Sequence, residues 1–222
     1  MNLNKSRFSL RLSAVALLAL AALPALAAPP TVSIAEARAL PPGTVVTVDG
    51  SVTTPSGAFE SSFFDVGFGL QDKSGGIYVS LQTNVGVAPR AQARVTGTLT
   101  NVSGLLTLMP ADPSDVEVHG AGPKVQAEFV STGAVGEATE GRLVQVVGTI
   151  TQAPASDLPY GYKFFVDDGS GELQIFVNTQ TGIDLSGLAV GQTVSVTGFS
   201  SQFDTHYEID PRSPADIVVR VP

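Results

Sequence analysis

An aromatic stretch in the second half of the chain has the spacing of a ligand-binding hairpin. The pattern predicts two short strands joined by a glycine turn, with Asp168 opposite Leu173. Side chains alternate across a strand, so one set faces the core and the other points outward. The predicted outward set consists of Lys163, Phe165, Phe176 and Asn178.

This outward set predicts stacking chemistry. Phe165 and Phe176 are expected to be cross-strand neighbours that form one aromatic surface. Nucleic-acid bases stack on such surfaces for roughly 1–3 kcal/mol each, whatever their sequence. Tyr160 and Tyr162 would extend the platform, and Lys163 would face a phosphate. The alternative is that Phe165 and Phe176 pack against another part of the chain.

A run of acidic residues around a histidine near the C-terminus has the composition of a metal site. Its members, expected on one side of a strand, are Asp204, His206, Glu208 and Asp210. One imidazole and three carboxylates suit a divalent ion. Successive positions on one face lie ~6.6 Å apart, however, which is too far for all four to share an ion. The alternative is a solvated outer face, with Tyr207 and Ile209 pointing inward.

Motifs for covalent catalysis are absent from the sequence. There is no cysteine, no Gly-x-Ser-x-Gly elbow, no phosphate loop and no dinucleotide fingerprint. Asp167 and Asp168 resemble a catalytic pair but belong to a hairpin turn. Asp168 and its counterpart Asp72 are expected to accept hydrogen bonds from the amides of their turns. We therefore predict a protein that is not an enzyme and needs no cofactor or metal.

The elements that must position these residues occur twice. Segments 45–50, 70–79, 93–97 and 110–115 recur in order as 143–148, 166–175, 194–198 and 211–216. The copies differ only by small insertions between these segments, as duplicated strands with variable loops would. A repeat of this length indicates two whole domains.

Each copy predicts about five short strands, rich in valine, threonine and isoleucine and separated by glycine turns. A capping box at Ser33 and Glu36 predicts a short helix before the first copy, and residues 131–138 are expected to repeat it. Glycines recur at matched positions within the strands, where a barrel must bend sharply. They are Gly50, Gly97, Gly148 and Gly198.

The N-terminus has the pattern of a secretory signal peptide. Lys5, Arg7 and Arg11 precede a short apolar run, and Ala25-Leu26-Ala27 provides small residues for cleavage before Ala28. The run is too short to span a membrane, so we expect a periplasmic or secreted protein without membrane insertion after cleavage. The signal carries three positive charges, and its removal takes the formal net charge from −8 to −11. Such an acidic chain repels polyanions at long range.

The repeated pattern resembles the OB-fold domains of exported bacterial proteins, which occur in tandem beside secreted nucleases and phosphoesterases. It consists of a Gly-x-x-Val-x-Val-x-Gly strand, then Phe-x-Leu-x-Asp-x-Ser-Gly-x-Ile, then Val-x-Val-x-Gly. In this chain it covers 43–50, 68–77 and 94–97, and again 141–148, 164–173 and 195–198. The resemblance implies an all-β fold of two tandem five-stranded OB-type barrels, each preceded by a short helix. The signal peptide would cover 1–27, the first OB domain 28–121 and the second 122–222.

OB barrels present ligands on the outer face of strands two and three. In the first copy this face carries Gly67, Gly69, Ser80 and Gln82, with Tyr78, expected opposite Gln71, as its one aromatic residue.

We therefore expect a binding protein for single-stranded nucleic acid, with the site mainly on the second domain. The alternatives are an envelope module that contacts a protein or cell-wall glycan, and an accessory subunit of a separate secreted nuclease.

Overall fold

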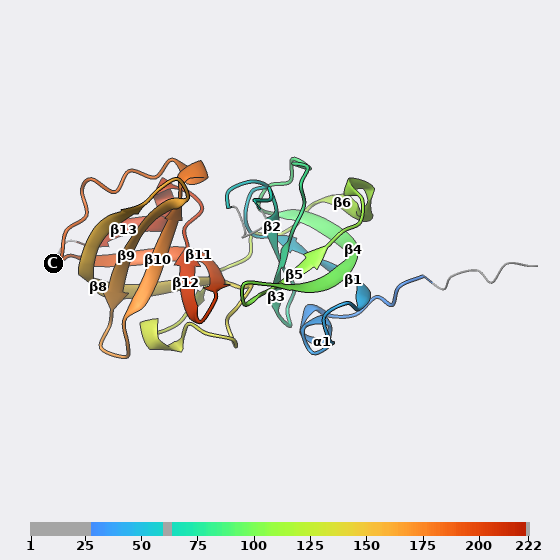
Figure 1. Ribbon diagram of the computed structural model, residues 1–222, viewed down its shortest axis with the longest axis horizontal. Coiled ribbons are helices and arrows are strands. Elements are labelled where there is room, and N and C mark those ends of the chain that lie inside the picture. The colour runs from blue at the N-terminus through green and yellow to red at the C-terminus, as the bar shows by residue number, and fades with distance from the viewer. Residues whose placement is uncertain (1–27, 60–63, 221–222) are drawn as a thin grey trace, which may run out of the picture.

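The computed structural model describes residues 28–59 and 64–220, which form two β-barrels lying side by side (Figure 1). The predicted signal peptide, residues 1–27, lies outside the described residues. Within the described ranges, no helix is long and apolar enough to cross a membrane.

The first barrel is a closed ring of five strands. Its elements are α1 (Ile34–Arg38), β1 (Val45–Val52), β2 (Phe68–Gln71), β3 (Gly76–Val79), β4 (Ala91–Val102), β5 (Leu105–Met109), η1 (Pro113–Asp115) and β6 (Val116–Ala121). The strand order is β1-β2-β3-β5-β4, and β4 pairs with β1 to close the ring. Strands β3 and β5 run parallel, whereas the other ring pairs are antiparallel.

The second barrel repeats this topology. Its elements are β7 (Glu128–Phe129), η2 (Thr132–Ala134), β8 (Leu143–Asp157), β9 (Gly161–Asp167), β10 (Leu173–Asn178), η3 (Thr179–Thr181), β11 (Thr193–Phe203), β12 (His206–Asp210), η4 (Pro214–Asp216) and β13 (Ile217–Arg220). The ring runs β8-β9-β10-β12-β11 and closes through β11 and β8, with β10 and β12 parallel. This five-stranded topology confirms the predicted all-β, OB-type fold.

Each barrel buries its own hydrophobic core because apolar residues alternate along its strands. Val46 and Val48 of β1 are fully buried in the first core, as are Phe164 and Val166 of β9 in the second. The period of two in the sequence therefore predicted correctly which side chains face inward.

An aspartate ties the hairpin of the first barrel to its leading helix. Helix α1 begins with the predicted capping box of Ser33 and Glu36. Asp72 accepts hydrogen bonds from the amide of Ser74, as predicted, at 2.7 Å and from the amide of Ile34 at 2.9 Å. Burial raises the pKa of Asp72, but these hydrogen bonds outweigh it and hold the pKa below its ordinary value.

In the second copy, Asp168 makes the equivalent hydrogen bonds to its turn and to a shorter leading segment. Asp168 accepts hydrogen bonds from the amide of Ser170 at 3.0 Å and from the amide of Thr132 at 3.1 Å. Hydrogen bonds from the hydroxyls of Ser170 and Thr132 lower the pKa of Asp168 strongly. The predicted helix over 131–138 is only a single 3₁₀ turn, η2.

The predicted register of the β9–β10 hairpin is wrong by two residues. Val166, not Asp168, lies opposite Leu173. The turn is longer because Asp167 and Asp168 both use their side chains to bind turn amides. A shift of two leaves the inward and outward faces unchanged, since the strand period is also two.

Two of the matched glycines lie where strands cross closely. A Cβ atom on Gly97 would lie 2.7 Å from the backbone of Met109, and one on Gly198 would lie 2.5 Å from the carbonyl oxygen of Asp210. No side chain fits at such distances, so glycine is required at both positions.

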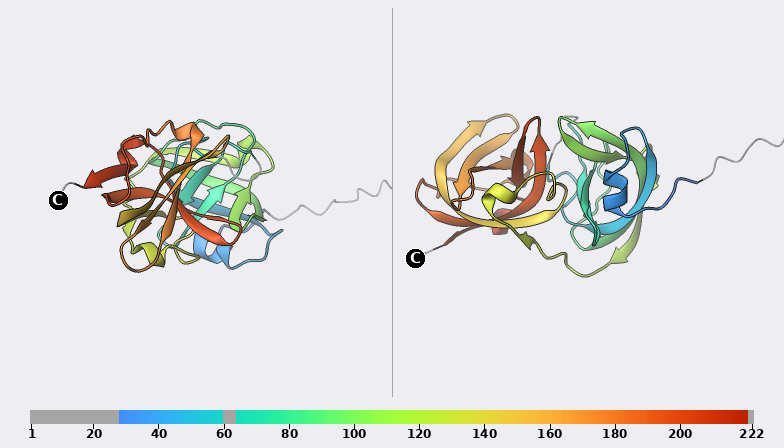
Figure 2. Two further views of the ribbon diagram at one scale, coloured as in Figure 1. Left: turned by 60° about the vertical axis from the view of Figure 1, so that its left-hand side comes forward. Right: turned by 90° about the horizontal axis from the view of Figure 1, so that it is seen from below.

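Polar contacts join the two barrels, which stand side by side when seen from below (Figure 2, right). Arg38 of α1 forms an ion pair with the buried Glu140 at 3.0 Å, and Arg142 donates to the carbonyl of Ser74 at 2.6 Å. A Cβ atom on Gly76 would lie 2.0 Å from the carbonyl oxygen of Gly141 in the other barrel. The two backbone segments are therefore in direct contact at this point.

Candidate ligand-binding site

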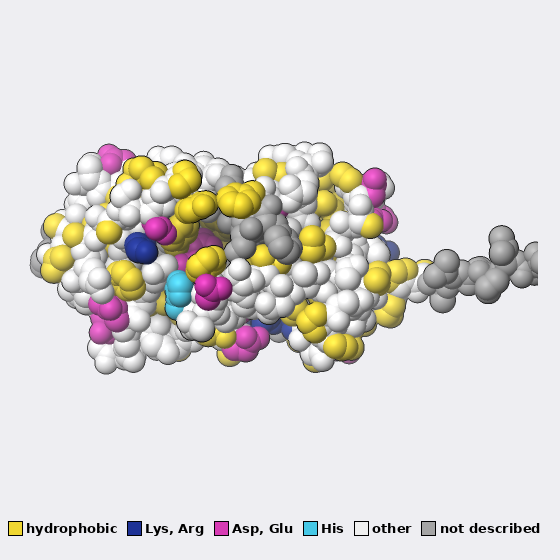
Figure 3. All heavy atoms as spheres, in the orientation of Figure 1, with side chains coloured by type: hydrophobic (Ala, Val, Ile, Leu, Met, Phe, Trp, Pro, Cys, Tyr) yellow, Lys and Arg dark blue, Asp and Glu magenta, His cyan; other side chains and the backbone are white. Residues whose placement is uncertain are grey.

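A cavity of about 390 Å³ opens between the two barrels. It lies over the outer face of β9, β10 and β12, and the turns after β8 and β11 border it. Its aromatic lining residues are Phe59, Phe64, Tyr78, Tyr160, Phe176, Phe199 and Phe203. Its charged or amide-bearing lining residues are Asp157, Lys163, Gln174, Asn178, Gln202, His206, Glu208 and Asp210. On this face, hydrophobic side chains surround a hollow with acidic side chains in its depth (Figure 3).

The predicted aromatic platform is divided. The predicted residues of the second barrel that line the cavity are Phe176, Lys163 and Tyr160. Phe165 lies opposite Gln174, and Phe176 lies opposite Lys163. The two rings are therefore diagonal neighbours and not the direct cross-strand pair that the sequence predicted. Phe165 and the exposed Tyr162 are not among the lining residues.

Tyr78 belongs to the junction between the barrels. It lies opposite Gly69, so its predicted pairing with Gln71 is wrong, by the same two-residue shift. Only 2% of its surface is exposed, and its ring packs edge-on against Phe199 of the second barrel with 5.8 Å between centroids. Its hydroxyl donates to Asp65 at 2.9 Å, and burial raises its pKa well above the ordinary value. Tyr78 closes one end of the cavity and forms no exposed platform.

The acidic face of β12 is buried, which corrects the expectation of a solvated surface. Ile209 points into the core as predicted, but Glu208 and Asp210 are only 6% and 7% exposed. Glu208 lies against Gln174 and His206 of the second barrel, and Asp210 lies near Tyr78 of the first. Asp204 is not on this strand, because it lies in the turn between β11 and β12.

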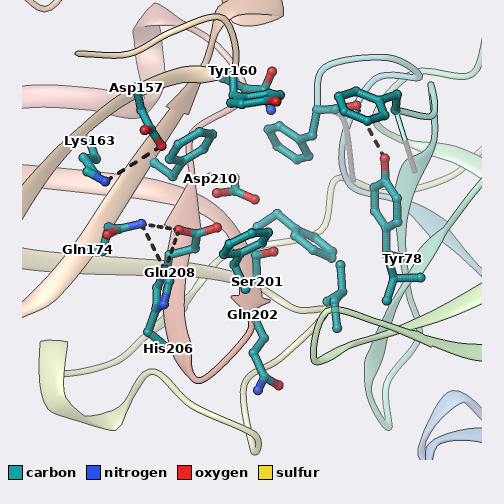
Figure 4. A pocket seen from close by; sticks show the side chains of 18 residues that line it. Tyr78, Asp157, Tyr160, Lys163, Gln174, Ser201, Gln202, His206, Glu208 and Asp210 are labelled. Carbon is teal, nitrogen blue, oxygen red and sulfur yellow. Dashed lines mark hydrogen bonds and ion pairs between the residues drawn. The ribbon is translucent and has the colours of Figure 1, made fainter. Parts of the chain in front are cut away.

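Glu208 is held by polar neighbours at the floor of the cavity (Figure 4). It accepts a hydrogen bond from the side-chain amide of Gln174 at 2.5 Å, and the imidazole of His206 lies 3.8 Å away. Burial raises the pKa of Glu208 to about 7, although the hydrogen bond from Gln174 and the charge of Lys163 oppose this shift. Glu208 can therefore exchange a proton near neutral pH.

Asp210 lies between this polar group and Tyr78 (Figure 4). Burial, and then the nearby charge of Glu208, raise its pKa well above the ordinary value, against a hydrogen bond from Ser201. Its Oδ1 atom is buried and has no hydrogen-bond partner among the described residues, and the same holds for Oδ1 of Asn178. A buried acceptor without a partner costs about 1–3 kcal/mol. The cavity therefore contains two buried oxygen atoms without a hydrogen-bond partner among the described residues.

Lys163 carries the one positive charge of lysine or arginine type among the described lining residues. Its ammonium group lies 3.8 Å from the carboxylate of Asp157, and both side chains are partly exposed. This pair lies above Gln174 and Glu208, with Asp210 to its side (Figure 4). The cation is thus placed where it can reach a ligand group that remains partly in solvent.

The metal-site hypothesis finds no geometric support in the part of the chain that the structure describes. No group of three or more histidine, cysteine, aspartate or glutamate side chains in these ranges is arranged to hold an ion. The polar partner closest to Glu208 is the amide of Gln174.

Comparison with known proteins finds one similar nuclease sequence. The chain is 27% identical over 183 residues to the endonuclease YhcR of Bacillus subtilis (strain 168), and the match covers 78% of this chain. It covers only 14% of the relative. No family model matches the sequence.

Two solved structures overlap with this chain to a limited extent. A murine DNA-binding protein bound to double-stranded DNA has a TM-score of 0.41 at 11% identity, covering 79% of this chain and 97% of that one. A replication protein A heterotrimer bound to single-stranded DNA has a TM-score of 0.33 at 15% identity, covering 43% and 83%. Overlaps this limited do not establish what the present chain binds.

Sequence reasoning placed Asn178 and Phe176 on the outer face but did not predict that Glu208 and Asp210 line a cavity. Gln174 was not among the predicted outward residues, although it has the same parity as Phe176. Glu208 and Asp210 were considered only as metal ligands or solvated acids. Glu208 contacts side chains of neighbouring strands, and Asp210 lies near Tyr78 of the first barrel, contacts that no local pattern records.

Proposed function

We propose that this chain is a binding protein for single-stranded nucleic acid and has no catalytic activity of its own. The observation that carries the proposal is the aromatic cavity on the strand-two and strand-three face of the second barrel. OB barrels bind oligonucleotides on this face and on the loops between strands one and two and strands four and five. Such loops of both barrels border the cavity. Similarity to part of an endonuclease also supports a nucleic-acid ligand.

In this proposal an unpaired base stacks on Phe176, and Tyr160 extends the contact from the loop after β8. Lys163 faces the phosphate of the bound nucleotide, replacing its present contact with Asp157. Because the chain without its predicted signal has a formal net charge of −11, binding is expected to be weak and strongly dependent on salt. We place the protein in the periplasm or outside the cell, on the basis of that signal.

The test is fluorescence-anisotropy titration of labelled single-stranded DNA and RNA with the chain from residue 28, at low and moderate salt. Phe176→Ala should weaken binding about 5- to 150-fold, which corresponds to the loss of one stacked base at about 1–3 kcal/mol. Phe165→Ala is the matched control, because Phe165 shares the outer face but does not line the cavity.

The absence of saturable binding at low salt would overturn the proposed function, and a protein or cell-wall glycan would then become the leading ligand. Equal losses in the two variants would place the ligand on the open strand face outside the cavity.

A further inference from the structure

We propose that the cavity between the barrels binds a small organic cation, in which a primary ammonium group is attached to an apolar or aromatic body. This inference goes beyond the proposed function, because the binding of such a ligand requires no oligonucleotide. It follows from the acidic floor of the cavity, from two buried oxygen atoms without partners, and from the aromatic walls.

The floor of the cavity holds two buried acids, and within the described residues neither has a lysine or arginine as its ion-pair partner. Glu208 and Asp210 are only 6% and 7% exposed. Lys163, the one lysine or arginine among the described lining residues, forms its ion pair with Asp157. A buried carboxylate is costly unless a counter-charge neutralises it, and otherwise the group keeps its proton. A cation that enters the cavity can therefore take the place of a proton at this floor.

The proton on Glu208 opposes a cationic ligand only weakly. Burial raises the pKa of Glu208 to about 7, so about half of the molecules carry a carboxylate at neutral pH. Binding only to this half lowers the apparent affinity by a factor of about two. Burial, and then the charge of Glu208, raise the pKa of Asp210 well above its ordinary value, so Asp210 stays protonated. One negative charge, on Glu208, is sufficient to attract the ligand.

Two buried oxygen atoms near Glu208 lack hydrogen-bond partners. Oδ1 of Asp210 and Oδ1 of Asn178 have no partner among the described residues, and both side chains are more than nine-tenths buried. The register of β12 and β10 places Asp210 beside Phe176, and Asn178 is the next outward position along β10. A protonated carboxyl group and an amide both keep an accepting oxygen, and an ammonium group brings three N–H donors and no acceptor. The ammonium group therefore matches this floor in both charge and hydrogen bonding.

The walls of the cavity suit a cation with an apolar body. Aromatic residues of both barrels line it, among them Phe64 of the first barrel and Tyr160 and Phe176 of the second. The rings of Phe64 and Tyr160 lie 6.0 Å apart between centroids. Ring faces attract an organic ammonium group electrostatically, most strongly where water is excluded. Aromatic walls and an acidic floor together favour a cation over a neutral or anionic ligand.

The size of the cavity and the charge of the chain agree with this ligand. A volume of about 390 Å³ falls within the range of small-molecule sites, which is about 300–1,000 Å³. The formal net charge of −11 that remains without the predicted signal attracts cations at long range. Because the cation and the base of the proposed function would both contact Phe176, each should weaken the binding of the other.

The test uses tryptamine, a primary ammonium group on an indole body, and tryptophol, in which a hydroxyl replaces the ammonium group. Isothermal titration calorimetry with the chain from residue 28 at pH 8 measures both affinities. Tryptamine should bind about 10-fold more tightly, because only tryptamine carries the charge. Its N,N,N-trimethyl derivative keeps the charge but has no N–H donor on the ammonium group, so its affinity should lie between the two.

The affinity for tryptamine should also rise about 10-fold between pH 6 and pH 8. The pKa of Glu208 is about 7, so its ionised fraction rises by about that factor over this range, while the amine stays protonated. Tryptophol should show no such rise. The other titratable groups that face Glu208 are Lys163 of β9, Asp157 of β8, His206 and Asp210 of β12, and Tyr78 of β3.

Glu208→Gln separates the effect of this carboxyl from that of its neighbours, because it removes only the charge of Glu208. It should lower the affinity for tryptamine about 10-fold, abolish the rise with pH, and leave the affinity for tryptophol unchanged. Asp204→Asn is the matched control, because Asp204 is exposed in the β11–β12 turn and does not line the cavity. Its backbone is left-handed at φ 51°, which asparagine tolerates. Thermal melting of both variants checks that they fold.

Equal affinities for tryptamine and tryptophol in the parent chain would overturn the cation site, and so would an absence of saturable tryptamine binding. An affinity for tryptamine that is the same at pH 6 and 8, or the same in Glu208→Gln and the parent chain, would also overturn it. Oligonucleotide binding is measured separately, so the proposed function and this inference can fail independently of each other.

Discussion

The outer faces of the two barrels have the same strand register but carry different side chains at equivalent positions. Where the second barrel has Phe165, Gln174 and Phe176, the first has Gly69, Tyr78 and Ser80. Where β12 has Glu208 and Asp210, β5 has Thr107 and Met109.

The difference shows how a duplicated fold can separate two tasks. In the first barrel, a Cβ atom on Gly69 would lie 2.9 Å from the ring of Phe199, so the absence of a side chain lets the second barrel dock. In the second barrel, the counterparts Gln174 and Phe176 line the cavity beside this contact. One copy therefore supplies a docking surface, and the other supplies the ligand contacts.

The docking surface is where substitution should have the largest effect. Phe199 is 1% exposed and packs against Tyr78 and Phe59 at centroid distances of 5.8 and 6.0 Å. Phe199→Ala should lower the free energy of unfolding by about 3–5 kcal/mol, because the junction cannot refill the cavity left behind. Urea unfolding measures this difference.

The control for this substitution lies on the same strand. Phe203 is 46% exposed, and Phe203→Ala should change the free energy of unfolding by no more than about 0.5 kcal/mol. Equal effects of the two substitutions would contradict the assignment of Phe199 to the docking surface.

The buried carboxyl of the second barrel should give stability an unusual pH dependence. The pKa of Glu208 is raised from 4.5 to about 7 in the folded state, so the folded state binds more protons between these values. Stability is then greatest below the unfolded pKa and falls as the pH rises from 4.5 through about 7. Glu208→Gln should flatten this fall when urea unfolding is compared between pH 5 and 8.

Other titratable groups face Glu208 and Asp210. Because they are present in both Glu208→Gln and the parent chain, the difference between the two reports on Glu208. They are Lys163 of β9, Asp157 of β8, His206 of β12, and Tyr78 of β3. Asp168→Asn is the control, and it should leave the difference in stability between pH 5 and 8 unchanged. The pKa of Asp168 is lowered in the folded state, so its contribution is present above the unfolded value and is lost as the pH falls. A parent chain equally stable at pH 5 and 8 would contradict the assignment to Glu208.

The smallest effect is expected at the rim of the cavity. Lys163→Met should reduce the slope of log affinity against log salt by about one for single-stranded oligonucleotides, because one phosphate contact is lost. Lys124→Met, at an exposed position between β6 and β7, is the matched control. Identical slopes in the two variants would remove Lys163 from the proposed contact.

The alternation of residues was enough to predict most of the fold. Val46 and Val48, and their counterparts in the second copy, face the core as their period requires. The repeat predicted that both barrels would share one topology. Asp72 and Asp168 were correctly predicted to bind turn amides, because such hydrogen bonds are local in sequence.

The hairpin register was less predictable. The side chain of Asp167 also binds amides of the turn, and this lengthens the turn by two residues. The parity of Phe165 and Phe176 survives that shift, whereas their direct pairing does not. Parity depends on the strand alone, but register depends on which turn the side chains stabilise.

The sequence by itself determined the two barrels, their repeated strand order and the identity of the outward side chains, because each follows from local periodicity. Only the tertiary structure decided that Tyr78 is buried, that Phe165 and Phe176 lie in different surroundings, and that Glu208 and Asp210 line a cavity. These outcomes depend on how one barrel docks on the other. Docking brings together residues about a hundred positions apart, and it changes the burial and the pKa of side chains whose neighbours in sequence stay the same.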